Sequence, residues 1–243
     1  MSTARITSKR RSPSYGWWLL AVLAVGTAAY SVPVYLTGNE SQSKIPLNPD
    51  VALHYLILGI HALPGGLLLA LGPIQFVPAW RNKYRKMHRV LGRVYMVSMV
   101  VASVAALFAA TFSEDGFPAQ VGFYILTAAW LYSMVQAYRT IRKGQIQLHR
   151  IWMIRNYALS FAAVVLRVFL LIGLALRSQF DWLSFEDVYT TSVWGSILIS
   201  AGVAEWFIVQ RTLKPLARSR KRPTDAQEQT GGRGIGKEEP AAV

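Results

Sequence analysis

The sequence predicts an all-α polytopic membrane protein with six transmembrane helices, in which spans two to five form a four-helix core. Three observations support this fold class. Apolar residues make up 53% of the chain and charged residues only 16%, below the quarter that is typical of soluble domains. Six apolar stretches reach the length of about 20 residues that crosses a bilayer. Each should be helical, because lipid offers no hydrogen-bond partner to an open backbone.

The first four spans lie in stretches that contain no Lys, Arg, Asp or Glu: residues 12–39, 51–80, 94–113 and 116–138. The fifth span, 151–176, carries Arg155 and Arg167, and the sixth, about 188–210, carries Glu205. The first span follows a basic start, as a signal peptide does. Its uncharged stretch is longer than the apolar part of a signal peptide, so we expect a retained helix.

Charged residues alternate in sign between successive connections of the spans. Basic residues gather in four segments: 5–11, 81–89, 139–150 and 211–222. The remaining connections hold most of the acids, namely Glu40, Asp50, Glu114, Asp115, Asp181, Glu186 and Asp187. The positive-inside rule therefore predicts a multi-pass protein of the cell (inner) membrane with both termini in the cytoplasm.

The chain divides into a transmembrane domain, residues 15–212, and two polar tails, 1–14 and 213–243, whose composition is typical of disorder. The net charge of +14 and the pI near 10.3 are common in nucleic-acid-binding proteins. Here the basic residues flank the spans, so we expect anionic lipid headgroups as partners and no nucleic acid. The absence of Cys excludes disulfides and thiolate metal sites.

Two basic motifs repeat along the chain. The first reads His88-Arg89-x-x-Gly92-Arg93-x-Tyr95, and the second reads His149-Arg150-x-Trp152-Met153-x-Arg155-x-Tyr157. With His61 and the segment Gly72-Pro73-Ile74-Gln75-Phe76, these motifs resemble the DUF2306 family of predicted bacterial membrane proteins. The resemblance covers about residues 55–175 and implies a polytopic membrane protein, with no assigned function.

Two ionisable side chains are expected near the middle of the membrane. His61 lies about 15 Å into span two and Arg167 about 14 Å from the outer end of span five. His54, His61 and Gln75 share one face of span two. Because no Asp or Glu lies at this depth, Arg167 needs backbone carbonyls, water or an anionic ligand. We expect His61 and Arg167 to line one cavity; a neutral, hydrogen-bonded His61 is the alternative.

His88 and His149 are candidates for the axial ligands of one b-type haem iron. Each lies just before a span that leaves the inner surface, so the two imidazoles could face one another across the bundle. Nearby arginines would hold the propionates, namely Arg89, Arg93, Arg150 and Arg155. The density of arginines argues against a bare metal ion. The alternative is that both histidines contact lipid phosphates.

These residues favour a membrane subunit that binds an anionic or amphipathic cofactor, haem b or a quinone, in an Arg/His-lined bundle. The alternatives are a small transporter of an anionic solute, using His61 and Arg167, and a cofactor-free assembly or scaffold protein. Arg155 and Glu205 are expected to form a structural ion pair. The sequence contains no Gly-rich phosphate loop, no His-Glu-x-x-His motif and no pair of acids deep in the membrane. It therefore does not indicate an enzyme class.

The loop charges generate a testable topology. Cysteines substituted for Lys86 and Lys143 should resist an impermeant thiol reagent in intact cells, because both positions lie on the cytoplasmic side. A cysteine at Glu114 should react. Labelling at Lys86 from outside the cell would refute this orientation.

Overall fold

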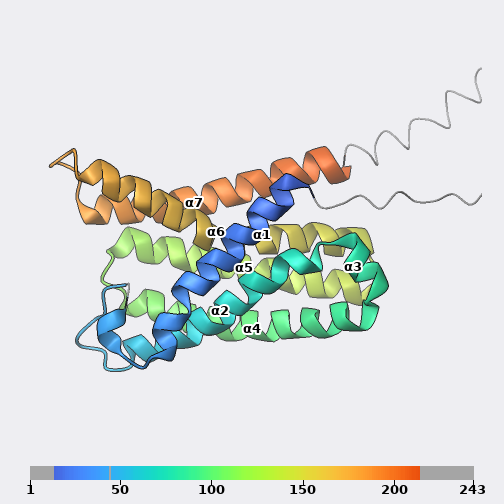
Figure 1. The fold of residues 1–243 in the computed structure, drawn as a ribbon, viewed down its shortest axis with the longest axis horizontal. Helices are drawn as coiled ribbons and strands as arrows, with labels where there is room; N and C mark the ends of the chain where they lie inside the picture. Colours follow the sequence, from blue (N-terminus) through green and yellow to red (C-terminus); the bar gives the residue numbers. More distant parts are fainter. Residues whose placement is uncertain (1–13, 44, 214–243) are drawn as a thin grey trace, which may run out of the picture.

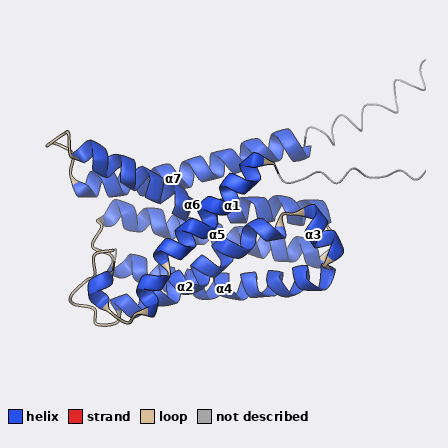
Figure 2. Ribbon diagram, viewed as in Figure 1, coloured by secondary structure: helices blue, strands red, loops and turns tan. Residues whose placement is uncertain are grey.

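A computed structural model describes residues 14–43 and 45–213 of the chain. The described residues form helices and loops without a strand (Figure 2). The predicted disordered tails lie almost entirely outside these residues. Six long helices run in chain order: α1 (Tyr15–Ser31), α2 (His54–Gln75), α4 (Arg85–Phe112), α5 (Phe117–Arg142), α6 (Ile146–Arg177) and α7 (Phe185–Ile208). Short helical turns complete the set: η1 (Pro33–Leu36), η2 (Glu40–Gln42), α3 (Pro78–Lys83) and the π-helical η3 (Val209–Leu213).

Five helical stretches are long and apolar enough to cross a membrane: Tyr15–Leu36, His54–Gln75, Arg85–Phe112, Ile146–Arg177 and Phe185–Arg211. Helix α5 has a similar length of 26 residues but carries more Tyr, Gln, Ser and Thr. It packs against α4, α6 and α7, so that Thr127, Ser133 and Thr140 are buried. The predicted polytopic helical bundle is confirmed.

The core is a ring of four helices in the order α2, α4, α5 and α6, closed by contact between α6 and α2. Helix α1 crosses obliquely over α2, and α7 pairs with α6 on the other side (Figure 1). Around the ring, α4 and α6 therefore lie opposite one another. The connections alternate between two ends of the bundle, and α3 lies at the end that carries the basic residues (Figure 1). We call these the basic end and the acidic end.

The helices at the basic end begin earlier than the sequence predicts. Val77 is extended because the following Pro78 disfavours helical backbone there, so α2 ends at Gln75 and α3 starts a new helix. Helix α5 ends at Arg142, and Gly144 follows with a φ of 70°, a backbone conformation that favours glycine. As a result, His88 lies in the first turn of α4 and His149 in the first turn of α6, not in the loops before them.

A buried hydrogen-bond network centred on Asn156 of α6 joins three helices of the ring. The Tyr95 hydroxyl of α4 donates to Asn156 Oδ1 at 2.8 Å. Asn156 Nδ2 donates to the Trp130 carbonyl at 3.0 Å and to Ser133 Oγ at 2.9 Å, both on α5. The Trp130 indole N–H donates to Ser160 Oγ at 2.8 Å. The amide is fully buried, and each of its polar atoms has a partner.

The segment Gly72-Pro73 fits α2 to Tyr157 of α6. Pro73 has no N–H to donate to the carbonyl of Leu69, and the Tyr157 hydroxyl donates to that carbonyl at 2.9 Å instead. A Cβ atom on Gly72 would lie 1.9 Å from Tyr157 Cε2, which is a severe overlap. Glycine therefore lets the ring reach α2, and proline leaves the acceptor that the hydroxyl satisfies.

This contact predicts two stability effects of different size. Tyr157→Phe should lower the free energy of unfolding by about 0.6 to 1.7 kcal/mol, the range for one interhelical hydrogen bond in a membrane protein. Gly72→Val should cost more, because it displaces the whole ring. Unfolding in detergent micelles, monitored by circular dichroism, would measure both. A Gly72→Val protein as stable as the wild type would contradict the packing described.

Candidate functional site

The two motif histidines lie at the basic end of the ring. His88 is in the first turn of α4 and His149 in the first turn of α6, and these helices lie opposite one another. Arg81, in α3, contributes positive charge at both imidazoles. The structure therefore places at the same end of the bundle two histidines that the sequence separates by about sixty residues.

One ring nitrogen of each histidine has a distinct environment. His149 Nδ1 lies 2.8 Å from the carbonyl oxygen of Ala137 in α5. Since a carbonyl can only accept, Nδ1 carries the hydrogen, and Nε2 is left as a lone-pair donor. His88 Nδ1 is buried and has no hydrogen-bond partner among the described residues.

Gln75 is a further unsatisfied polar side chain at this end. It is the last residue of α2 and is 9% exposed. Both its amide nitrogen and its amide oxygen are buried without a partner within the described part of the chain. Buried polar groups are almost always paired, so this amide is a candidate ligand-binding group. The sequence placed Gln75 on the face of His61 and did not predict this position beside the basic motifs.

The arginines expected around a haem are differently placed. Arg89 and Arg93 are exposed on the surface of α4. Arg155 donates through Nε and Nη2 to the two carboxylate oxygens of Glu205 in α7, at 2.5 and 2.9 Å. Its guanidinium also lies 4.7 Å from the centroid of the Trp152 ring. The expected Arg155–Glu205 pair is confirmed, and it occupies the carboxylate-binding edge of Arg155.

The predicted midplane pair lies in the half of the bundle nearer the acidic end. His61 Nδ1 lies 2.9 Å from the carbonyl of Ala102 in α4. Arg167 Nη1 donates to the carbonyl of Ala163, one turn earlier in α6, at 2.7 Å. The charge of Arg167 reaches His61. This interhelical hydrogen bond is the one expected in the alternative interpretation, in which His61 is a neutral, hydrogen-bonded residue of the bundle.

His54 takes no part in either group of residues. It is buried at the acidic end and its Nδ1 accepts a hydrogen bond from the Asn48 backbone N–H at 2.9 Å. This bond holds the loop that precedes α2. His54 therefore serves as a natural control among the four histidines.

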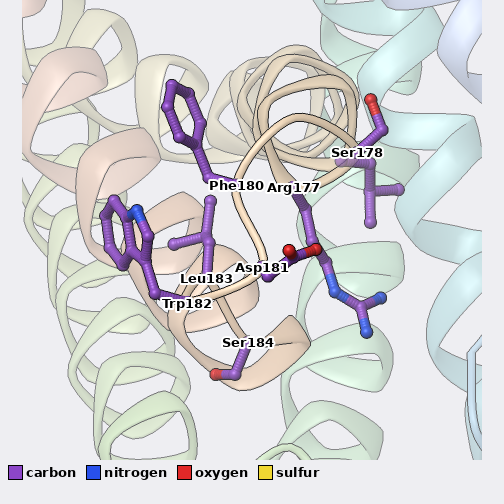
Figure 3. Close-up of a pocket in the computed structure, with 8 residues that line it drawn as sticks. Arg177, Ser178, Phe180, Asp181, Trp182, Leu183 and Ser184 are labelled. Carbon is purple, nitrogen blue, oxygen red and sulfur yellow. The ribbon is translucent and has the colours of Figure 1, made fainter.

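Two pockets among the described residues lie away from these histidines. One, of about 440 Å³, is formed by the turn between α6 and α7 (Figure 3). Phe180 and Trp182 lie on one side of it and Arg177 with Asp181 on the other. The second, of about 410 Å³, is an entirely apolar groove between α2 and α4. The exposed Phe180 and Trp182 of the first pocket lie at a helix end, a position that is typical of aromatic residues at the membrane interface.

A family model described as a predicted membrane protein, DUF2306, matches residues 58–208. The match is longer than the segment that carries the sequence motifs and includes α7. No curated protein and no solved structure matches the chain.

The Arg155–Glu205 pair generates a prediction for a double-mutant cycle. Arg155→Met alone should destabilise the protein, because it leaves a carboxylate uncompensated beside lipid. Arg155→Met combined with Glu205→Leu should recover part of that loss. The comparison uses unfolding midpoints in the same detergent. Glu205→Leu alone completes the cycle, and a loss in the double variant equal to the sum of the two single losses would show that the pair contributes nothing.

Proposed function

The chain belongs to the DUF2306 family of predicted membrane proteins, and we propose that it is a membrane subunit that holds haem b between His88 and His149. The observation that carries this proposal is the placement of the two histidines in the first turns of opposite helices, at the basic end of the ring. Two histidines from facing helices of a bundle could hold a haem iron between them.

The hydrogen bond of His149 supports a ligand role. A metal-binding histidine usually donates its second ring N–H to a carbonyl or carboxylate, which fixes the tautomer and the ring orientation. For His149, the Ala137 carbonyl is the acceptor of this second N–H. His88 Nε2 would be the opposite ligand. Its buried Nδ1 has no hydrogen-bond partner among the described residues.

Charge at this end of the bundle also favours a haem. Haem propionates are anionic, and Arg81 is the cation whose charge reaches both imidazoles. We assign it the propionate-binding role in preference to Arg155, which pairs with Glu205. Bound haem supplies one-electron transfer, and the protein residues would hold it, fix its orientation and tune its potential.

A quinone is the second candidate, favoured by Gln75. Its unpaired amide offers one donor and one acceptor, which suit the carbonyl or hydroxyl of a quinone or quinol ring. In either case we propose that the basic end faces the cytoplasm. There the exposed Arg89 and Arg93 would contact anionic lipid headgroups.

The test is the absorption spectrum of the protein purified in detergent. The wild type should show the Soret and α bands of a b-type haem after expression with haem supply or after reconstitution. His88→Ala and His149→Ala should each abolish these bands, because each removes an axial ligand. His54→Ala should retain them, since His54 only anchors a loop.

A folded wild-type protein that stays colourless after reconstitution would refute the haem proposal. Extraction of a bound quinone from the same preparation, lost in Gln75→Leu, would then support the second candidate. Proteoliposomes that take up an anionic solute would indicate the transporter instead. A protein with neither cofactor nor uptake would match an assembly or scaffold role.

A further inference from the structure

The turn that joins α6 to α7 forms a pocket of about 440 Å³ at the acidic end of the bundle (Figure 3). Pockets that bind small molecules have volumes of about 300 to 1,000 Å³. All of its lining residues lie between Leu174, in the last turn of α6, and Ser184, just before α7. The pocket is therefore built by one continuous segment and is separate from the histidines at the basic end.

Hydrogen bonds within the turn fix the form of this pocket. The backbone N–H of Phe180 donates to the Leu176 carbonyl at 3.2 Å, and that of Leu183 donates to the Phe180 carbonyl at 3.1 Å. Ser184 then caps α7, because its Oγ donates to Asp187 Oδ2 at 2.5 Å and accepts from the Asp187 backbone N–H at 3.1 Å. A site held in this way is largely formed before a ligand binds, which lowers the entropic cost of binding.

Two charged side chains line one side of the pocket, and neither is paired within the described part of the chain. They are Arg177 and Asp181, both exposed (Figure 3). The ion pair between α6 and α7 described above is the only one among the described residues, and neither Arg177 nor Asp181 takes part in a side-chain hydrogen bond there. The Ser178 hydroxyl, by contrast, donates to the Ala175 carbonyl at 2.6 Å. A guanidinium and a carboxylate are therefore the polar groups that the pocket offers to a ligand.

The opposite side of the pocket is aromatic. The rings of Phe180 and Trp182 have centroids 6.1 Å apart, and the two residues are 47% and 77% exposed. On the neighbouring surface of α6, Leu171 is 70% and Ile172 is 54% exposed, as is usual for residues that contact lipid tails. Because exposed tryptophans gather where a membrane meets water, we place this turn at the membrane interface.

We propose that this pocket binds the headgroup of a zwitterionic phospholipid, with the phosphodiester on Arg177 and the primary ammonium on Asp181. An isolated anion would be repelled by Asp181 and an isolated cation by Arg177, whereas a zwitterion pairs with both. The face of the Trp182 ring also attracts an ammonium group. The acyl chains extend along the exposed apolar side chains of α6. This site takes no part in holding a haem, and its test is independent of the haem proposal.

The experiment counts the lipids that the full-length protein retains. The wild type, Arg177→Gln and Asp181→Asn are reconstituted into nanodiscs of equal parts phosphatidylethanolamine and phosphatidylglycerol, and bound lipids are identified by native mass spectrometry. The wild type should retain phosphatidylethanolamine in excess. Arg177→Gln should lower this retention by about fivefold, the effect of one exposed ion pair. Asp181→Asn should abolish the excess over phosphatidylglycerol, because the ammonium loses its partner while Arg177 still binds phosphate.

Two substitutions outside the pocket serve as matched controls. Gln179→Ala changes the same turn at a residue that does not line the pocket. Glu114→Gln removes an exposed acid from another loop at the acidic end. Both should retain phosphatidylethanolamine as the wild type does. Since Arg177 and Asp181 are exposed, their variants should unfold at the same temperature as the wild type in the same detergent, which separates lost binding from lost folding.

A titration with glycerophosphoethanolamine, the headgroup without acyl chains, separates a lipid from a soluble zwitterion. The lipid proposal expects no saturable rise in the unfolding temperature of the delipidated protein. A saturable rise that Arg177→Gln removes, without retention of phosphatidylethanolamine, would assign the two charges to a solute and overturn the proposal. It is also overturned if the wild type retains the two lipids equally, or if Arg177→Gln retains as much phosphatidylethanolamine as the wild type.

Discussion

The buried amide of Asn156 is the interaction on which the bundle depends most. It lies on α6, accepts from Tyr95 of α4 and donates to the Trp130 carbonyl and Ser133 of α5. Apolar side chains attract one another no more than they attract lipid tails, so close packing and hydrogen bonds decide which helices associate. An amide has four hydrogen-bonding positions in a fixed geometry. It therefore specifies how the three helices are rotated about their axes and how far each is shifted along its length.

The polar groups at the centre of the ring are paired, whereas some at its basic end have no partner among the described residues. In the middle, Asn156, Trp130 and Ser160 share a closed network, and Tyr157 takes the carbonyl that Pro73 leaves free. Towards the basic end, the Gln75 amide and His88 Nδ1 have no partner among the described residues.

The two helices outside the ring contribute unequally to these regions. Helix α1 is fixed at the basic end, where the Trp17 indole N–H donates to the Pro73 carbonyl at 3.2 Å. The turn that follows α1 brings Tyr35 to the acidic-end half, beside α2. Helix α7 supplies Glu205 to Arg155 near the basic end, and it buries Tyr189 against Phe123 and Phe185 towards the acidic end. The family match begins within α2, so Tyr35 lies outside the matched residues and Tyr189 within them.

The sequence by itself determined the helical class, the approximate spans, the segregation of basic and acidic connections and the pairing of Arg155 with Glu205. These follow from local properties: runs of apolar residues, the sign of nearby charges and the presence of a single acid near a single arginine. Only the tertiary structure decided that His88 and His149 lie on opposite helices at one end, that the Gln75 amide has no partner among the described residues and that Tyr157 donates to the Leu69 carbonyl. Such contacts join residues far apart in the chain, and they depend on the rotation and offset of whole helices. Periodicity tells which residues share a face, but close packing decides which faces meet.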